Sequence, residues 1–248
     1  MKPNRILISD IDGTLLNNGK ETRGLDTLRD LLARHKNDVA LVYATGRSHD
    51  SVWDLIRADI LPIPDAIAAS IGTEIWFPNW KQSDKRFKSL IGNDWNRETI
   101  LNAALTIPGL RLQDEEMQTP YKVSFEVSSH RKVMDIQSLL KTKGLAVRII
   151  YSCGKYLDVL PARGGKMAAV KFLSQVWEVP FKNILTSGDS GNDMDMLTHP
   201  ETANVLVANA ESEMASLVKT NCVYHADGSY AAGVVEGCRA FGFWPQAS

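Results

Sequence analysis

Two carboxylates one residue apart follow the first apolar run of the chain, in the sequence ILISDIDG. The run from Ile6 to Ile8 is typical of a buried parallel strand, because such strands are apolar on both faces. Asp10 and Asp12 then fall at the carboxyl end of that strand, where open α/β sheets bind their ligands. Two acids this close repel each other unless a cation or hydrogen bonds compensate, so the pair predicts a metal ion, a shared proton, or both.

Two other segments offer groups that bind anions. In ATGR, Thr45 supplies a hydroxyl and Gly46 a backbone amide that an anion can approach closely. Lys166, in GGKMAAVKFL, stands where a helix should begin, although the helix dipole disfavours a cation at that end. A phosphate or carboxylate beside Lys166 would turn this penalty into attraction. A plain helix cap and a solvated surface lysine are the alternative interpretations of the two segments.

A second acidic group follows the apolar strand NILTSGD, in the sequence GDSGND. Asp189 and Asp193 lie four residues apart, with Asn192 beside them. Because the carboxyl ends of parallel strands meet at one edge of a sheet, we expect all of these acids to converge on one crevice.

The elements that must position these groups alternate between helix and strand near both ends of the chain. Leu25, Leu28 and Leu32 recur at helical spacing, and DVALVYATG reads as a second apolar strand. The same alternation returns beyond Pro161. This pattern predicts the α/β class, with a Rossmann-like parallel sheet.

Between these parts the pattern changes. The sequence predicts a helix over residues 95–107, strands in LRLQ and YKVSFEV, a helix over HRKVMDIQSLLKTKG, and a closing hairpin of VRIIYS and KYLDVLP. That order, αββαββ, is typical of a compact α+β module. We therefore predict a split core of residues 1–80 and 161–248 that carries an inserted domain of residues 81–160.

Composition limits the kinds of partner. The 248 residues include 44% hydrophobic and 23% charged residues, which is ordinary globular composition and argues against disorder. A formal net charge of -1 offers no basic field for nucleic acid or an anionic membrane, so a small-molecule partner is favoured. The N-terminal apolar run is too short for a signal peptide or a spanning segment, and three widely spaced cysteines fit reduced thiols. We expect a cytoplasmic protein.

In order, DIDGT, ATGR, Lys166 and GDSGND resemble the motifs of the haloacid dehalogenase (HAD) superfamily of phosphotransferases. The resemblance extends over essentially the whole chain and implies a HAD core with an inserted cap domain. Within the superfamily, YATGRS, GTEIW, YKVSFEV, YSCGKYLDVLP and GDSGND resemble the sucrose-phosphate phosphatases and their relatives, the mannosylfructose-phosphate phosphatases. This implies Mg²⁺-dependent hydrolysis of a sugar phosphate, with sucrose 6-phosphate the first candidate.

The resemblance also implies a role for each motif residue. Asp10 would attack phosphorus and form an aspartyl phosphate, and Asp12 would act as general acid and base. The implied Mg²⁺ ligands are Asp10, the backbone carbonyl of Asp12, and Asp189, with Asp193 near or in the outer shell. The groups implied to hold the phosphoryl oxygens are Thr45, the Gly46 amide, Lys166 and Asn192. Arg47 and Asp195 are assigned no catalytic role, only loop anchoring and helix surface.

The strand YKVSFEV alternates between apolar and polar residues. Lys122, Ser124 and Glu126 lie on one side of it, opposite an apolar face. The pattern alone favours a solvated sheet face, whereas the family resemblance implies that Lys122 and Ser124 bind the sugar. Glu74, in GTEIW, is a further sugar-binding candidate from the core.

Other functions stay open at this level. A phosphomutase would share Asp10, Asp12 and the metal but would return the phosphoryl group to another hydroxyl. A receiver-like module would accept a phosphoryl group as a signal, although the chain length and the inserted domain argue against it. The resemblance also raises association or fusion with a sugar-phosphate synthase, and it leaves mannosylfructose phosphate as an alternative substrate.

Overall fold

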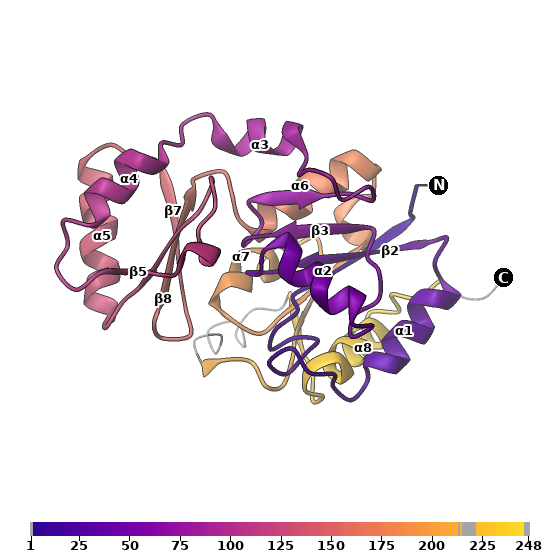
Figure 1. Cartoon of the computed structure of the whole chain (residues 1–248). Coiled ribbons are helices and arrows are strands. Elements are labelled where there is room, and N and C mark those ends of the chain that lie inside the picture. Colours follow the sequence, from indigo (N-terminus) through magenta and orange to yellow (C-terminus); the bar gives the residue numbers. More distant parts are fainter. Residues whose placement is uncertain (1, 213, 215–221, 246–248) are drawn as a thin grey trace.

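The computed structural model describes residues 2–212, 214 and 222–245 and contains two sheets (Figure 1). The larger sheet has seven strands in the order β11-β10-β9-β1-β2-β3-β4. Its strands are β1 (Arg5–Ser9), β2 (Val39–Ala44), β3 (Ala66–Ala69), β4 (Glu74–Trp76), β9 (Ile184–Gly188), β10 (Ala203–Leu206) and β11 (Val223–His225). All neighbours pair in parallel except β4, which is antiparallel to β3. The predicted parallel sheet is therefore present.

Helices cover both faces of this sheet, as its apolar strands require. One face packs on α1 (Leu25–Arg34), α2 (His49–Arg57) and α8 (Tyr230–Ala240). The other face packs on α3 (Lys85–Gly92), α6 (Lys166–Trp177) and α7 (Met194–Leu197). The predicted helical repeat of Leu25, Leu28 and Leu32 is confirmed, because all three side chains are buried in α1.

The smaller sheet has four strands in the order β5-β6-β8-β7, all antiparallel. They are β5 (Arg111–Leu112), β6 (Val123–Glu126), β7 (Val147–Ser152) and β8 (Tyr156–Pro161). Two helices, α4 (Arg97–Ala104) and α5 (His130–Thr142), cover one face through an apolar cluster of their own. In Figure 1 these helices lie on the side of the small sheet away from the core. The predicted order of helices and strands in this module matches the structure.

One helix of the predicted insert was not anticipated. Phe87 and Ile91 of α3 are buried in the same cluster as Phe172 of α6, so α3 packs against the large sheet and not against the small one. Phe87 and Ile91 thus form the apolar side of α3 that packs on the large sheet. The domain limits at residues 81 and 160 stay a prediction.

None of the helices among the described residues is long and apolar enough to cross a bilayer.

Candidate active site

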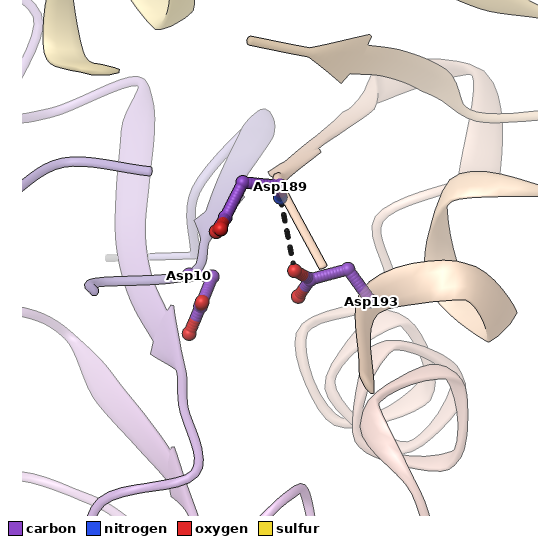
Figure 2. A group of neighbouring side chains, drawn as sticks. All are labelled: Asp10, Asp189 and Asp193. Atoms are coloured by element: carbon purple, nitrogen blue, oxygen red, sulfur yellow. Dashed lines mark hydrogen bonds between the residues drawn. The ribbon is translucent and has the colours of Figure 1, made fainter. Parts of the chain in front are cut away.

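Three acidic side chains meet at the carboxyl ends of two adjacent strands (Figure 2). Asp10 follows β1, Asp189 follows β9, and Asp193 lies in the short 3-10 helix Gly191–Asp193. β1 and β9 are paired in parallel, and the amide of Asp10 donates to the carbonyl of Ser187, so the two strand ends are level. One carboxylate oxygen of each acid lies within 4.8 Å of the others. The expected convergence of these acids on one crevice is confirmed.

Lys166 is the cation that contacts this cluster among the described residues. It is the first residue of α6 and is completely buried, with its Nζ 3.0 Å from Oδ1 of Asp10 and 2.6 Å from Oδ1 of Asp193. The surface-lysine interpretation is therefore wrong. Carboxylates at the start of the helix provide the negative charge that makes a lysine tolerable there.

Asp193 is held from two sides. Its Oδ1 contacts Lys166, while its Oδ2 accepts hydrogen bonds from the backbone amides of Asp189, at 3.0 Å, and Ser190, at 3.1 Å. Both oxygens are thus engaged in fixing Lys166 and the loop that carries Asp189. This arrangement suits a supporting role better than direct coordination of a metal ion.

The glycine of DIDGT is explained by the position of Asp189. Gly13 has φ 83°, and a Cβ atom there would lie 2.1 Å from Oδ2 of Asp189. A side chain would therefore displace the carboxylate, in addition to the strain of a left-handed backbone. Thr14, the next residue, donates a hydrogen bond of 2.7 Å to Oδ1 of Asp189 and fixes it from the same loop.

Negative charge exceeds positive charge in this cluster. Burial, opposed by Lys166 and reinforced by Asp193, raises the pKa of Asp10 to about 7. Burial and the charges of Asp10 and Asp193 raise the pKa of Asp189 to about 8. Both shifts mean that ionised carboxylates here lack sufficient compensation. A divalent cation held by oxygen ligands fits the site, because it would supply that positive charge.

Asp12 points toward a different partner. Its carboxylate accepts two hydrogen bonds from Arg47, at 2.5 Å from Nε and 2.8 Å from Nη2, and Arg47 also donates to Ser51 of α2. Arg47 therefore anchors its loop, as expected, but it does so directly at Asp12. The two acids of the DIDGT motif have separate cationic partners: Lys166 for Asp10 and Arg47 for Asp12.

Three other residues expected to hold phosphate line a cavity beside the acidic cluster: Thr45, Gly46 and Asn192. The hydroxyl of Thr45 accepts a hydrogen bond from the amide of Arg47. Within the described part of the chain, the buried Oδ1 of Asn192 has no hydrogen-bond partner. A buried polar atom left unpaired at a cavity wall is a position that a ligand can satisfy.

A cavity of about 850 Å³ extends from these residues to the small sheet. The wall on that side is mostly polar and includes Lys122, Glu126, Ser152, Tyr156 and Asp158. Lys122 is 2% exposed, and its Nζ lies 3.6 Å from Oδ1 of Asp158. The solvated-face interpretation of YKVSFEV is therefore wrong for Lys122, which is buried at the cavity wall.

The family model of sucrose-6F-phosphate phosphohydrolase matches residues 3–242. The chain belongs to this family.

Three known proteins illustrate what this member of the phosphohydrolase family is similar to. Sucrose-phosphatase 1 of Nicotiana tabacum is 33% identical over 98% of the chain, and the match covers 60% of the tobacco protein. Mannosylfructose-phosphate phosphatase of Agrobacterium fabrum is 30% identical over 99% of the chain and all of its own length. The X-ray structure of the sucrose-phosphatase from Synechocystis, in complex with sucrose and phosphate, superimposes with a TM-score of 0.90 at 29% identity, covering 98% of this chain and 100% of the other.

These matches confirm the expected HAD fold and identify a phosphatase family. The chain spans about 60% of the length of the tobacco relative, so what the remainder of that protein contributes has no counterpart in these residues.

Two of the expected sugar-binding residues of this family member do not line the cavity. Ser124 is fully buried beside Asp158, its neighbour on β8, and its hydroxyl lies 2.5 Å from Oδ1 of Asp158 and 3.1 Å from the carbonyl oxygen of Met117. Glu74, on the edge strand β4, accepts a hydrogen bond from the indole of Trp76, two residues along on the same face. Trp76 in turn stacks on His49 of α2, with ring centroids 4.0 Å apart, and Glu74 is not among the described residues that line the cavity.

Sequence reasoning missed three residues at the site: Thr14, Arg47 as a partner of Asp12, and Asp158. Asp158 carried a usable signal, since an acid inside the apolar strand KYLDVLP breaks the pattern of a buried strand. Arg47 and Thr14 carried no comparable signal, because polar residues are common after a strand.

Proposed function

We propose that this protein is a Mg²⁺-dependent phosphatase that hydrolyses a sugar phosphate through an aspartyl phosphate on Asp10, with sucrose 6-phosphate as its preferred substrate. One observation carries the proposal. Asp10 lies at one end of a cavity whose opposite wall is formed by the small sheet, and the buried Lys166 contacts the carboxylate of Asp10 at 3.0 Å. A phosphoryl group at the first end would leave the attached sugar against the second.

In the proposed reaction, a carboxylate oxygen of Asp10 attacks phosphorus as the bond from phosphorus to the sugar oxygen breaks. Asp12 donates its proton to that oxygen, so that a neutral sugar leaves. Asp12 then accepts a proton from the water that attacks the phosphorus of aspartyl phosphate, which restores Asp10 and releases phosphate. Lys166, Thr45, the Gly46 amide and Asn192 would hold the phosphoryl oxygens as charge moves among them.

Asp10, Asp189 and the backbone carbonyl of Asp12 would hold the metal ion, and Asp193 would support them from behind. When bound, Mg²⁺ would offset the charge of the phosphate and of the carboxylates. The raised pKa values of Asp10 and Asp189 support this assignment, because they reflect a deficit of positive charge among the side chains of the site.

The substrate proposal rests on the relatives and on the cavity. The Synechocystis structure contains sucrose and phosphate together, and the tobacco relative is named a sucrose-phosphatase. A volume of about 850 Å³ is in the usual range for a small-molecule site and suits a disaccharide phosphate. Lys122 and Asp158 would contact the sugar, with Ser124 holding Asp158 in place. Mannosylfructose phosphate is the alternative, through the Agrobacterium relative.

We also propose that the four-stranded module is the substrate-selecting cap, inserted at about residues 81–160, and that the protein is cytoplasmic. Association with a sugar-phosphate synthase is a further proposal, which a pull-down with the synthase would test.

A phosphate-release screen over sugar phosphates, with and without Mg²⁺, tests the function. We expect many turnovers on sucrose 6-phosphate with Mg²⁺ and almost none after chelation. Transfer of the phosphoryl group to a second sugar hydroxyl without free phosphate would indicate a phosphomutase instead. A single turnover that leaves a stable phosphoprotein would indicate a receiver-like module.

A further inference from the structure

One strand of the small sheet contacts both core segments that surround the expected phosphate position. Arg148 and Ile150 are alternate residues of β7, so their side chains lie on the same face of the sheet. Arg148 pairs with Asp195 of α7, which accepts a hydrogen bond from the first turn of α6, and Ile150 contacts the turn after β3. Neither residue is among the described residues that line the cavity.

Arg148 acts on the segment that carries Lys166. Its Nη1 lies 2.8 Å from Oδ2 of Asp195, and the same oxygen accepts a hydrogen bond of 3.2 Å from the amide of Met167. Asp195 therefore caps the first turn of α6 while Arg148 holds it from the small sheet. The fit is close, because a Cβ on Gly165 would lie 2.7 Å from Oδ2 of Asp195 and 3.3 Å from Nη1 of Arg148. The assignment of Asp195 to helix surface is therefore wrong.

Ile150 acts on the segment that carries Thr45 and Gly46. It packs against Ile71 and Leu160 in a small apolar cluster between the two sheets. Ile71 in turn donates its amide to the carbonyl of Thr45 at 2.8 Å. The side chain of Ile71 thus faces the small sheet while its backbone supports the expected phosphate-binding loop.

The turn that contains Ile71 is strained. Ser70, Ile71 and Gly72 all have left-handed backbones, with φ of 53°, 59° and 66°. For a β-branched residue such as Ile71 this conformation is a genuine outlier, and such outliers persist only where surrounding contacts hold them. The contacts here are the apolar cluster on one side and the hydrogen bonds to Thr45 and Arg47 on the other.

We propose that Arg148 and Ile150 are positioning residues that set the geometry of the two phosphate-binding segments, so that phosphate affinity depends on contact with β7. The proposal rests on the proposed function only in taking phosphate as the ligand of Lys166, Thr45 and Gly46. It assigns the small sheet a second task besides contacting the sugar.

Calorimetric binding of inorganic phosphate in the presence of Mg²⁺ tests this, because phosphate is too small to reach β7. We expect Arg148→Gln and Ile150→Ala to raise the Kd for phosphate about fivefold or more, a size usual for coupling through packed contacts. The matched controls are Lys132→Gln, which removes a charge from α5, and Ile136→Ala, which opens the apolar cluster beneath the same sheet. Both controls should change the Kd less than about twofold.

An unchanged Kd in Arg148→Gln and Ile150→Ala would overturn the proposal, as would an equal rise in the two controls. If Ile150→Ala does not fold, Ile150→Val takes its place.

Arg148→Gln should raise the Kd for phosphate little further in a protein that already carries Asp195→Asn, because both substitutions remove the same contact. Fully additive effects on the Kd would contradict the mechanism. A wild-type protein that binds phosphate but releases none from sugar phosphates would refute the proposed function and leave this inference standing. Failure of the wild type to bind phosphate would refute the inference itself.

Discussion

At the scale of single residues, identical side chains in this site differ because their partners differ. Asp10 contacts Lys166 in a buried cluster, whereas Asp12 accepts two hydrogen bonds from Arg47 near the cavity opening. The proposed nucleophile and the proposed acid are therefore distinguished by surroundings and not by residue type.

Asp10→Asn should abolish turnover, because an amide has nearly the same shape as a carboxylate but is not a competent nucleophile. Phosphate release from sucrose 6-phosphate measures this, and circular dichroism checks that the fold is intact. Asp12→Asn should retain some formation of aspartyl phosphate from p-nitrophenyl phosphate, whose leaving group needs little protonation. Substantial turnover by Asp10→Asn would place the nucleophile elsewhere.

Gly13→Ala should lose Mg²⁺-dependent activity, because the new Cβ would displace the Asp189 carboxylate, 2.1 Å away. Gly144→Ala is the matched control: Gly144 also has a positive φ, of 69°, but nothing lies within 4 Å of its Cβ position. Both variants should lose about 1 kcal/mol of unfolding free energy through backbone strain.

Activity and denaturant unfolding, measured on both variants, separate the effect of displacing the Asp189 carboxylate from the effect of backbone strain. Equal activity in Gly13→Ala and Gly144→Ala would show that the position of the Asp189 carboxylate is not critical.

At the scale of elements, β6 presents one face to the apolar cluster of the small sheet and the other to the cavity. Val123 and Phe125 are fully buried against α4 and α5, while Lys122, directly before β6, reaches the cavity wall and Ser124 holds Asp158. The strict alternation of a strand allows one short segment to serve both purposes.

The double variant Lys122→Met, Ser124→Ala should lose efficiency on sucrose 6-phosphate and keep its rate on p-nitrophenyl phosphate. Each lost hydrogen bond should cost about 0.5 to 1.5 kcal/mol, and more where it is charged, so we expect kcat/KM to fall by roughly one to two orders of magnitude. Steady-state kinetics on both substrates measure this, with Lys132→Met as a control on α5. Equal losses on the two substrates would indicate general damage, and no loss on either would remove the sugar-binding assignment.

At the scale of the whole molecule, stability and metal binding are linked through the acids that follow β1 and β9. Asp10 and Asp189 have folded-state pKa values of about 7 and about 8, above their ordinary value of 3.8. An acid whose pKa is raised by folding stabilises the folded state below its unfolded pKa, and that contribution is lost as pH rises through the folded pKa. The metal-free protein should therefore lose unfolding free energy between about pH 4 and pH 8.

Mg²⁺ should reverse this loss, since it competes with protons for the same carboxylates. We expect the rise in Tm on adding Mg²⁺ to be larger at pH 8 than at pH 5, measured by differential scanning calorimetry. Asp189→Asn should reduce the difference between the two pH values. An equal rise at both would mean that Mg²⁺ does not bind at these acids.

The sequence by itself determined the elements and the motif residues. Period-two and helical patterns are local, so they located β7 at residues 147–152 and the buried repeat of α1, and strands ending in acids predicted the cluster of Asp10 and Asp189. The helix α3 was not predicted, because its apolar side consists of only two residues, whose burial depends on packing with α6 in the folded chain.

Only the tertiary structure decided which polar residues become partners. Arg47 and Asp12 are 35 positions apart, and Arg148 and Asp195 are 47 apart, so no local period relates them. The contact of Ser124 with Asp158 likewise depends on the pairing of β6 with β8. Local patterns indicate which face of an element is apolar. Which polar residue meets another from a distant element depends on how the two sheets pack in the folded chain.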